Sequence, residues 1–253
     1  MKVFVDLHLC PNPQDLDMTR QMIEKSAELG YKIVGVSLSP KYLQSEIERI
    51  RKICSEVDLD FVSRIDLEPL NTMDLLKSLS LFRRKVEIIS VKCNSKSVAR
   101  QAAKDRRVDI LSFSHLDMRK RFFDSAEAEL ASSASALLEF DLAPLISLYG
   151  FQRIRLLSKM RIEVLTAKKY GVPIILSSGA DDVRFLRKPG DYASLGYLFG
   201  LDIGDAKKAL SEIPKEMIER NRRKLSLNYV APGIYIVRRG KDCIEGLDDA
   251  TSQ

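Results

Sequence analysis

Short apolar runs recur along most of the chain, separated by longer stretches of mixed polarity. The runs are rich in valine and isoleucine and lie near 3–7, 33–38, 61–67, 86–91, 108–113, 136–140 and 172–176. Their length and composition are typical of strands that are buried on both faces. Helices are expected in the intervals, near 15–29, 42–56, 72–84, 95–105, 123–134 and 152–170. This alternation predicts an α/β protein with one parallel sheet.

An open, doubly wound sheet and a closed barrel share this pattern. Seven units follow one another without a break and at even spacing, as barrel units require. No G-x-G-x-x-G motif follows the first strand, where a dinucleotide-binding sheet would carry it. We therefore predict a TIM-like barrel of about seven βα units. C-terminal helices are expected to complete it, near 192–199, 204–212 and 215–224.

The end of the chain differs in composition from the rest. Residues 233–238 alternate like a late strand, and residues 1–241 are expected to form a single barrel domain. Residues 242–253 carry four acidic side chains and no basic one, and are expected to be a disordered tail. The N-terminus has no signal-peptide pattern, and no apolar stretch approaches the roughly 20 residues of a membrane span. We expect a cytoplasmic protein without a membrane partner.

Composition narrows the class of protein further. The chain is 45% hydrophobic and 30% charged, which indicates a folded domain with a solvated surface. Lysine and arginine outnumber the acidic residues by 41 to 35, and the resulting charge of +6 suits a polyanionic partner without requiring one. The four cysteines are scattered and contain no C-x-x-C pair, so free thiols in a reducing compartment are expected.

The first strand ends in Asp6-Leu7-His8-Leu9-Cys10. This resembles the D-x-H-x-H opening of the PHP phosphoesterases, in which two histidines project from one strand face into a metal cluster. Cys10 replaces the second histidine here, although Glu68 and His115 could imitate later ligands. The chain contains only two histidines, too few for that cluster. We expect a PHP-like barrel whose metal site has eroded; a PHP-like phosphoesterase using His8, Glu68 and His115 is the alternative.

Carboxylates also stand at several strand ends. They are Asp6, Asp66, Glu68, Glu139 and Asp141. Barrel catalysis occurs at such positions, but carboxylates there more commonly cap helices. No other nucleophile or phosphate-loop signature is present. We assign no catalytic residue.

Basic residues are better organised, in three clusters of the second half. In the helix near 153–170 the remainder of the surface is largely basic, with Glu163 as an isolated acid, and one arc is apolar: Leu156, Leu157, Met160, Val164 and Ala167. A second cluster surrounds the fifth strand and consists of Lys104, Arg106, Arg107, Arg119, Lys120 and Arg121. A third cluster lies in 215–224. Small residues after the seventh strand would let backbone N–H groups approach an oxyanion, or would form a tight turn. We predict an RNA-binding set of Arg119, Lys120, Arg121, Arg155, Lys159, Ser177, Ser178, Arg184, Arg187 and Lys188.

Several segments together resemble the ribonuclease P protein component 3 family (RNase P p30 type). They are Ser177-Ser178-Gly179-Ala180, Arg184, Lys188-Pro189-Gly190-Asp191-Tyr192, 195–201 and Glu139-Phe140-Asp141-Leu142-Ala143-Pro144-Leu145. Ala143 departs from the family's usual basic residue, which removes one possible RNA contact. With Phe4-Val5-Asp6-Leu7 and the order of units, the resemblance extends over most of 1–212.

The resemblance implies a PHP-like barrel that serves as a subunit of the ribonucleoprotein that removes 5′ leaders from precursor tRNA. It implies that RNA is the catalyst and uses Mg²⁺, while the protein binds RNase P RNA and has no independent catalytic activity. It also implies a small RRM-like partner subunit, paired with this one in a heterotetramer, and other RNase P proteins. No cofactor bound by the protein itself is expected.

Overall fold

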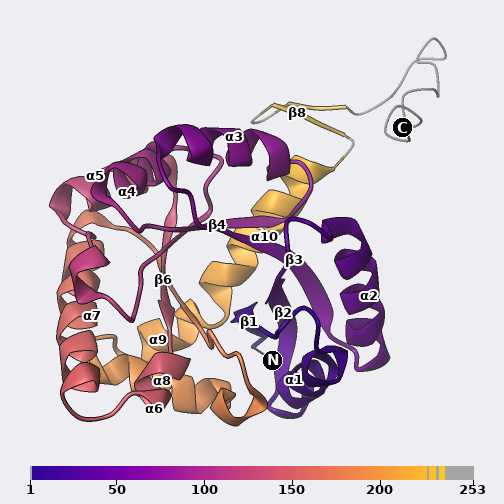
Figure 1. Cartoon of the computed structure of the whole chain (residues 1–253), viewed down its shortest axis with the longest axis horizontal. Coiled ribbons are helices and arrows are strands. Elements are labelled where there is room, and N and C mark those ends of the chain that lie inside the picture. The colour runs from indigo at the N-terminus through magenta and orange to yellow at the C-terminus, as the bar shows by residue number, and fades with distance from the viewer. Residues whose placement is uncertain (1, 227, 232–233, 237–253) are drawn as a thin grey trace.

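Seven parallel strands form a nearly closed barrel in chain order, surrounded by helices (Figure 1). The computed structural model describes residues 2–226, 228–231 and 234–236. The strands are β1 Phe4–Leu9, β2 Tyr31–Ser37, β3 Asp60–Leu67, β4 Ile88–Lys92, β5 Ile110–Ser112, β6 Leu137–Asp141 and β7 Ile174–Ser177. The predicted barrel of about seven units is confirmed, and the apolar runs mark its strands.

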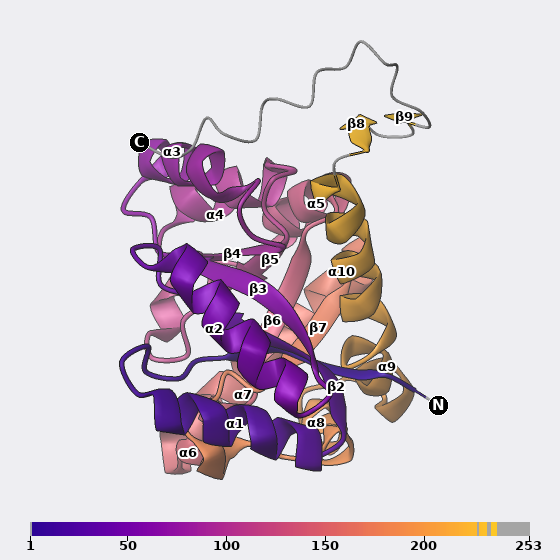
Figure 2. The ribbon, with the colours of Figure 1, turned by 90° about the vertical axis from the view of Figure 1, so that its right-hand side faces the viewer.

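The helices lie outside the barrel, and the last long one lies across one of its ends (Figure 2). They are α1 Leu16–Glu28, α2 Leu43–Glu56, α3 Thr72–Phe82, α4 Lys96–Lys104, α5 Ser125–Ala134, α6 Ala143–Ser147, α7 Gly150–Tyr170, α8 Pro189–Leu198, α9 Ile203–Ala209 and α10 Glu212–Leu225. Short 3₁₀ helices occupy Met118–Lys120 and Val183–Phe185. Side chains of Asp15, Asn71, Ser95 and Asp124 cap α1, α3, α4 and α5, which explains where these helices begin.

The barrel closes between β1 and β7 without a regular ladder. Leu9 and Ala180 form an isolated bridge, and the amide of Cys10 donates to the carbonyl of Ala180 at 2.7 Å. Further down, the amide of Val5 donates to the carbonyl of Leu210 at 2.8 Å. The segment after α9 therefore pairs with β1 where an eighth strand would otherwise lie.

Helix α10 crosses the N-terminal end of the barrel. Met217 and Ile218 pack in one apolar cluster with inward side chains of the strands, such as Val5 and Ile88. Arg222 then clamps the helix, with its Nη1 2.7 Å from Asp60 and its Nε 2.6 Å from Glu87. The basic stretch predicted as a helix thus has a structural role, because it covers the N-terminal end of the barrel, which we call the floor.

The late strand is not part of the barrel. β8 Tyr229–Ala231 and β9 Ile234–Tyr235 form a separate two-stranded antiparallel sheet next to the end of α10. The predicted tail, 242–253, lies outside the described residues. Within the described part of the chain, no helix combines the length and the apolar character that crossing a membrane requires.

A bulge in β1 redirects its end toward the barrel interior. Asp6 pairs with Val34 and Leu9 with Val36, so three steps on β1 match two on β2. Gly35 lies opposite, and a Cβ there would stand 2.5 Å from the carbonyl oxygen of Leu7. Glycine at this position lets the backbone of Leu7 enter the barrel, and the bulge brings His8 to the same interior.

Candidate functional site

A buried arginine occupies the centre of the upper barrel. Arg64 lies in the middle of β3, and its side chain has no solvent exposure. Its Nη1 and Nη2 donate to the two carboxylate oxygens of Glu139, both at 2.6 Å. Nη2 also donates to Asp66 at 2.8 Å, and Nη1 to the carbonyl of Leu7 at 3.0 Å. This two-pronged geometry is the strong form of an arginine–carboxylate pair.

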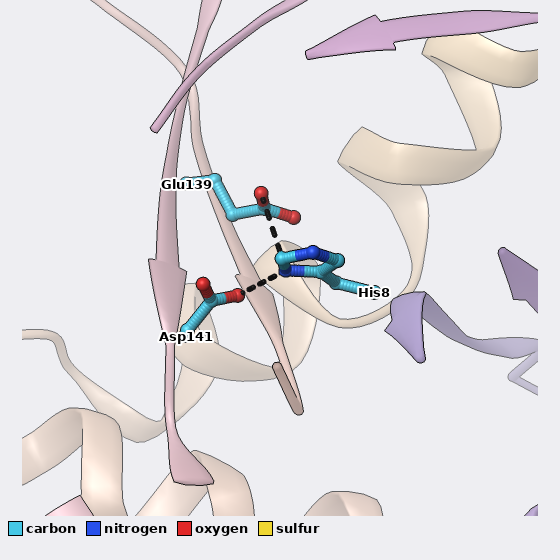
Figure 3. A group of neighbouring side chains, drawn as sticks. All are labelled: His8, Glu139 and Asp141. Carbon is cyan, nitrogen blue, oxygen red and sulfur yellow. Dashed lines mark hydrogen bonds and ion pairs between the residues drawn. The ribbon is translucent and has the colours of Figure 1, made fainter. Parts of the chain in front are cut away.

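His8 lies beside this arginine, between the carboxylates of Asp141 and Asp66. Its Nδ1 is 2.7 Å from Oδ1 of Asp141 (Figure 3). Its Nε2 is 3.4 Å from Asp66. Burial and Arg64 lower the pKa of His8, but the carboxylates of Asp141 and Asp66 raise it, and the net pKa is well above the usual value. Burial raises the pKa of Asp66, yet Arg64 and His8 hold it well below the usual range. The cluster therefore contains two cations and ionised carboxylates.

The resemblance of residues 6–10 to a PHP metal motif raises the question of whether these residues fit a metal ion. His8, Glu139 and Asp141 each offer one ligand atom, all within 4.8 Å of one another. Both oxygens of Glu139 already accept from Arg64, and Oε1 also accepts from the Ser177 hydroxyl at 2.7 Å. A protonated imidazole has no lone pair for a metal. Arg64 supplies the positive charge that a cation would bring, so this donor set does not fit a metal ion.

The predicted alternative set, His8, Glu68 and His115, lines the mouth of the barrel but does not converge. All three border one cavity of about 680 Å³ at the carboxyl ends of the strands. Glu68 is half exposed and forms an ion pair with Lys92. Burial lowers the pKa of His115, which therefore stays neutral near pH 7. The carboxylates that approach His8 are instead Asp66, Glu139 and Asp141.

Two serines predicted to bind RNA are fully buried. Ser177 donates its hydroxyl to Glu139, and Ser178 donates its hydroxyl to the carbonyl of His8 at 3.0 Å. The amide of Ser178 donates to Asp6 at 2.9 Å. Their hydrogen-bonding groups hold β7 against β1 and β6, so both hydroxyls make their contacts inside the protein.

Arg121, another member of the predicted RNA-binding set, is buried as well. Its side chain is 3% exposed, and its Nε lies 2.8 Å from Glu163 on α7. Nη1 donates to the carbonyls of Phe113 and Ser114, both at 3.1 Å. Arg121 therefore anchors the 3₁₀ turn that presents Arg119 and Lys120, and four of its five N–H donors are used within the protein.

The other predicted residues remain at the surface. Exposed side chains are those of Arg119, Lys120, Arg155, Lys159, Arg184 and Lys188. Arg119 and Arg155 border one cavity of about 340 Å³ together with His115. Arg184 pairs with Asp182 through two hydrogen bonds at 3.0 Å. Arg187 is half-buried and donates to the carbonyl of Arg184 at 2.7 Å, so part of its capacity is used in its own loop.

Arg64 is not among the residues predicted from the sequence. The signal was present: a charged residue interrupts the apolar strand Phe61-Val62-Ser63-Arg64-Ile65. The period of two along a strand also places it on the same face as Asp66. Asp66, Glu139 and Asp141 were noticed at strand ends, but the arginine that joins two of them is visible only when β3 and β6 face each other across the barrel.

Comparison with known families and curated proteins gives consistent matches. Residues 3–226 match the model of a family described as RNase P subunit p30. A ribonuclease P protein component 3 of Methanothermobacter thermautotrophicus is 27% identical over 92% of this chain and 95% of its own length. One of Methanosarcina mazei is 28% identical over 97% of both.

Solved structures agree on the fold. A chain from a cryo-EM structure of archaeal ribonuclease P with mature tRNA superposes with a TM-score of 0.82 at 22% identity, over 94% of this chain and all of that one. A putative histidinol phosphatase of Listeria monocytogenes superposes with a TM-score of 0.51 at 11% identity, over 72% of this chain and 97% of that one. At such identities the likeness is one of fold.

Proposed function

Because the chain belongs to the RNase P subunit p30 family and is a ribonuclease P protein subunit, we propose that it binds the RNase P RNA through phosphate contacts and supports RNA-catalysed removal of 5′ leaders from precursor tRNA. The Mg²⁺ ions of the reaction are held by RNA in this proposal. The protein contributes binding and positioning, and no bond-breaking group.

This proposal rests on the difference between the buried basic residues and the exposed ones. Inside the protein, Arg64 and Arg121 form ion pairs with the buried carboxylates of Glu139 and Glu163. On the surface, Lys120, Arg155, Lys159 and Lys188 are exposed, and none makes an ion pair with another described residue. Cations without acidic partners can neutralise RNA phosphates and release the counterions bound to them. The interior charges hold the barrel together, and the exterior charges are free for RNA.

Removing three of these cations is expected to weaken RNA binding. Replacing Lys120, Arg155 and Lys188 together by glutamine should flatten the slope of log K against log salt by roughly two, since each phosphate contact contributes roughly 0.7–0.9. The measurement is filter binding of transcribed RNase P RNA at several salt concentrations. A matched control replaces the exposed Lys41, Arg51 and Lys52 by glutamine. An equal effect of both variants would show a response to net charge alone.

If RNA is the catalyst, substitutions at the mouth of the barrel should have only small effects on the cleavage rate. Replacing Glu68 or His115 by alanine should leave the maximal cleavage rate of the reconstituted enzyme within a few-fold. Removing a true general acid or base typically costs on the order of 10²–10⁴-fold. The measurement is single-turnover cleavage of precursor tRNA at saturating Mg²⁺. A hundredfold loss with RNA binding intact would contradict the proposal and favour a catalytic role of the protein.

The purified protein is expected to hold no stoichiometric transition metal. The reason is the donor set, in which Arg64 and a protonated His8 stand among the carboxylates. Elemental analysis of protein purified without added metal tests this. One equivalent of zinc or manganese would support the alternative, a metal-dependent phosphoesterase that acts alone.

We further propose that the subunit works in the cytoplasm and pairs with a small RRM-like subunit in a heterotetramer, alongside other RNase P proteins and the precursor tRNA. Unpaired thiols at Cys10, Cys54 and Cys93 suit a reducing compartment. The mass of the co-expressed complex in solution tests the stoichiometry.

A further inference from the structure

A basic groove lies at the N-terminal end of the barrel, opposite the mouth described above. Its volume is about 600 Å³. Four segments meet there: the turns before β4 and β5, the end of α10, and strand β8 next to it (Figure 2). The residues that line it are Arg83, Arg84, Arg106, Arg107, Lys224, Leu225, Ser226, Tyr229 and Val230. Five of these are cations and none is acidic.

Nearby carboxylates neutralise only part of this charge. Asp109 is buried and accepts from Nη1 of Arg83 at 2.5 Å, and Asp105 accepts from Nη2 of Arg107 at 2.8 Å. Arg84 and Arg106 are exposed and make no ion pair with any described residue. Two guanidinium groups in the groove therefore have their full donor capacity available to a ligand.

The cations are close enough to affect one another. Partial burial lowers the pKa of Lys224, and the neighbouring Arg220, Arg83 and Arg106 lower it further, against an opposing effect of Asp109. Cations held close together repel one another at a cost that a polyanion would relieve. The positive charges of the groove are thus only partly neutralised in the free protein.

We propose that this groove, centred on Arg84, Arg106 and Lys224, binds the phosphate backbone of RNA. The inference rests on the proposed function and adds a second RNA-contacting surface to it. Arginine presents a planar fork of donors that matches two phosphate oxygens, and arginines predominate here. The mouth at the other end has a mixed lining, in which His8 and Lys92 stand beside Asp66, Glu68, Asp141 and Asp181. One subunit would then hold RNA at the rim and at the floor of the barrel.

The test is a triple substitution, Arg84→Gln, Arg106→Gln and Lys224→Gln, in the full chain. With transcribed RNase P RNA as the probe, we expect at least tenfold weaker binding near 0.15 M salt and a salt slope flatter by roughly two to three. The matched control is again Lys41→Gln, Arg51→Gln and Lys52→Gln, with wild-type affinity expected. Thermal unfolding of each variant, and the Arg84→Gln, Arg106→Gln double variant, separate lost contacts from lost folding.

The outcomes distinguish the groove from the proposed function. Unchanged affinity and slope in the triple variant, with tight binding by wild type, overturn the groove and leave the function standing. Failure of the wild-type protein to bind the RNA overturns both. A third outcome is that the triple variant binds RNA normally but no longer assembles with an acidic partner subunit. This outcome also overturns the groove as an RNA site and identifies it as a protein interface.

Discussion

Replacing Arg64 by methionine is expected to destabilise the protein by about 3–5 kcal/mol, the typical effect of removing one partner of a buried ion pair. Methionine fills much of the same space but leaves Glu139 and Asp66 without the guanidinium that each contacts at 2.8 Å or less. The two buried carboxylates without a partner destabilise the folded state by more than the packing of the methionine side chain stabilises it. Urea unfolding at pH 7 measures the change.

The pH dependence identifies the cause. In the wild type, the lowered pKa of Asp66 contributes stability above pH 4, and this contribution is lost only as pH falls through the folded value. Without Arg64 the pKa of Asp66 should rise, so the deficit should be largest at neutral pH and smaller near pH 5. Arg64→Lys, which keeps the charge, should lose less at pH 7. A deficit independent of pH would point to packing instead of charge.

Replacing Glu127 by glutamine should stabilise the protein at alkaline pH, by roughly 4 kcal/mol at pH 8. Glu127 lies on α5 without solvent exposure, and neither of its carboxylate oxygens has a hydrogen-bond partner in the described part of the chain. Burial, with a smaller contribution from Asp124, raises the pKa of Glu127 to about 8, against an opposing effect of Arg100. The folded protein therefore holds a proton there that the unfolded chain has released.

The sign of the effect follows from that proton. Between the unfolded pKa of 4.5 and the folded pKa of about 8, the native state binds more protons, so stability falls as pH rises. Glutamine cannot ionise, and its advantage should be small at pH 5 and large at pH 8. Glu129→Gln, at an exposed position of the same helix, is the matched control. An identical pH profile for wild type and Glu127→Gln would show that Glu127 has an ordinary pKa.

Helix α7 shows what a periodic sequence pattern can and cannot predict about burial. The predicted apolar arc is confirmed for Leu156, Met160, Val164 and Ala167, all buried. Glu163 stood out in the sequence only as an isolated acid among basic residues. Its role as the buried partner of Arg121 depends on a contact across 42 residues, which no local spacing encodes.

The order of strands, the positions of most helices and the family resemblance followed from the sequence by itself. These features depend on local composition and period, because a buried parallel strand is a short β-branched run wherever it occurs. The residues 177–180 and the two histidines were also visible as candidates, but their chemistry was not. The same serines suit a phosphate loop or a buried strand junction until their neighbours are known.

Only the tertiary structure decided which charges face inward. Barrel closure places Arg64 against Glu139, which is 75 residues away, and His8 against Asp141, which is 133 residues away. It also buries Ser177 and Ser178 and leaves Arg84 and Arg106 on the barrel floor. A charged side chain is buried when a partner can satisfy it and exposed when none can, and partners from separate strands meet only when the barrel closes.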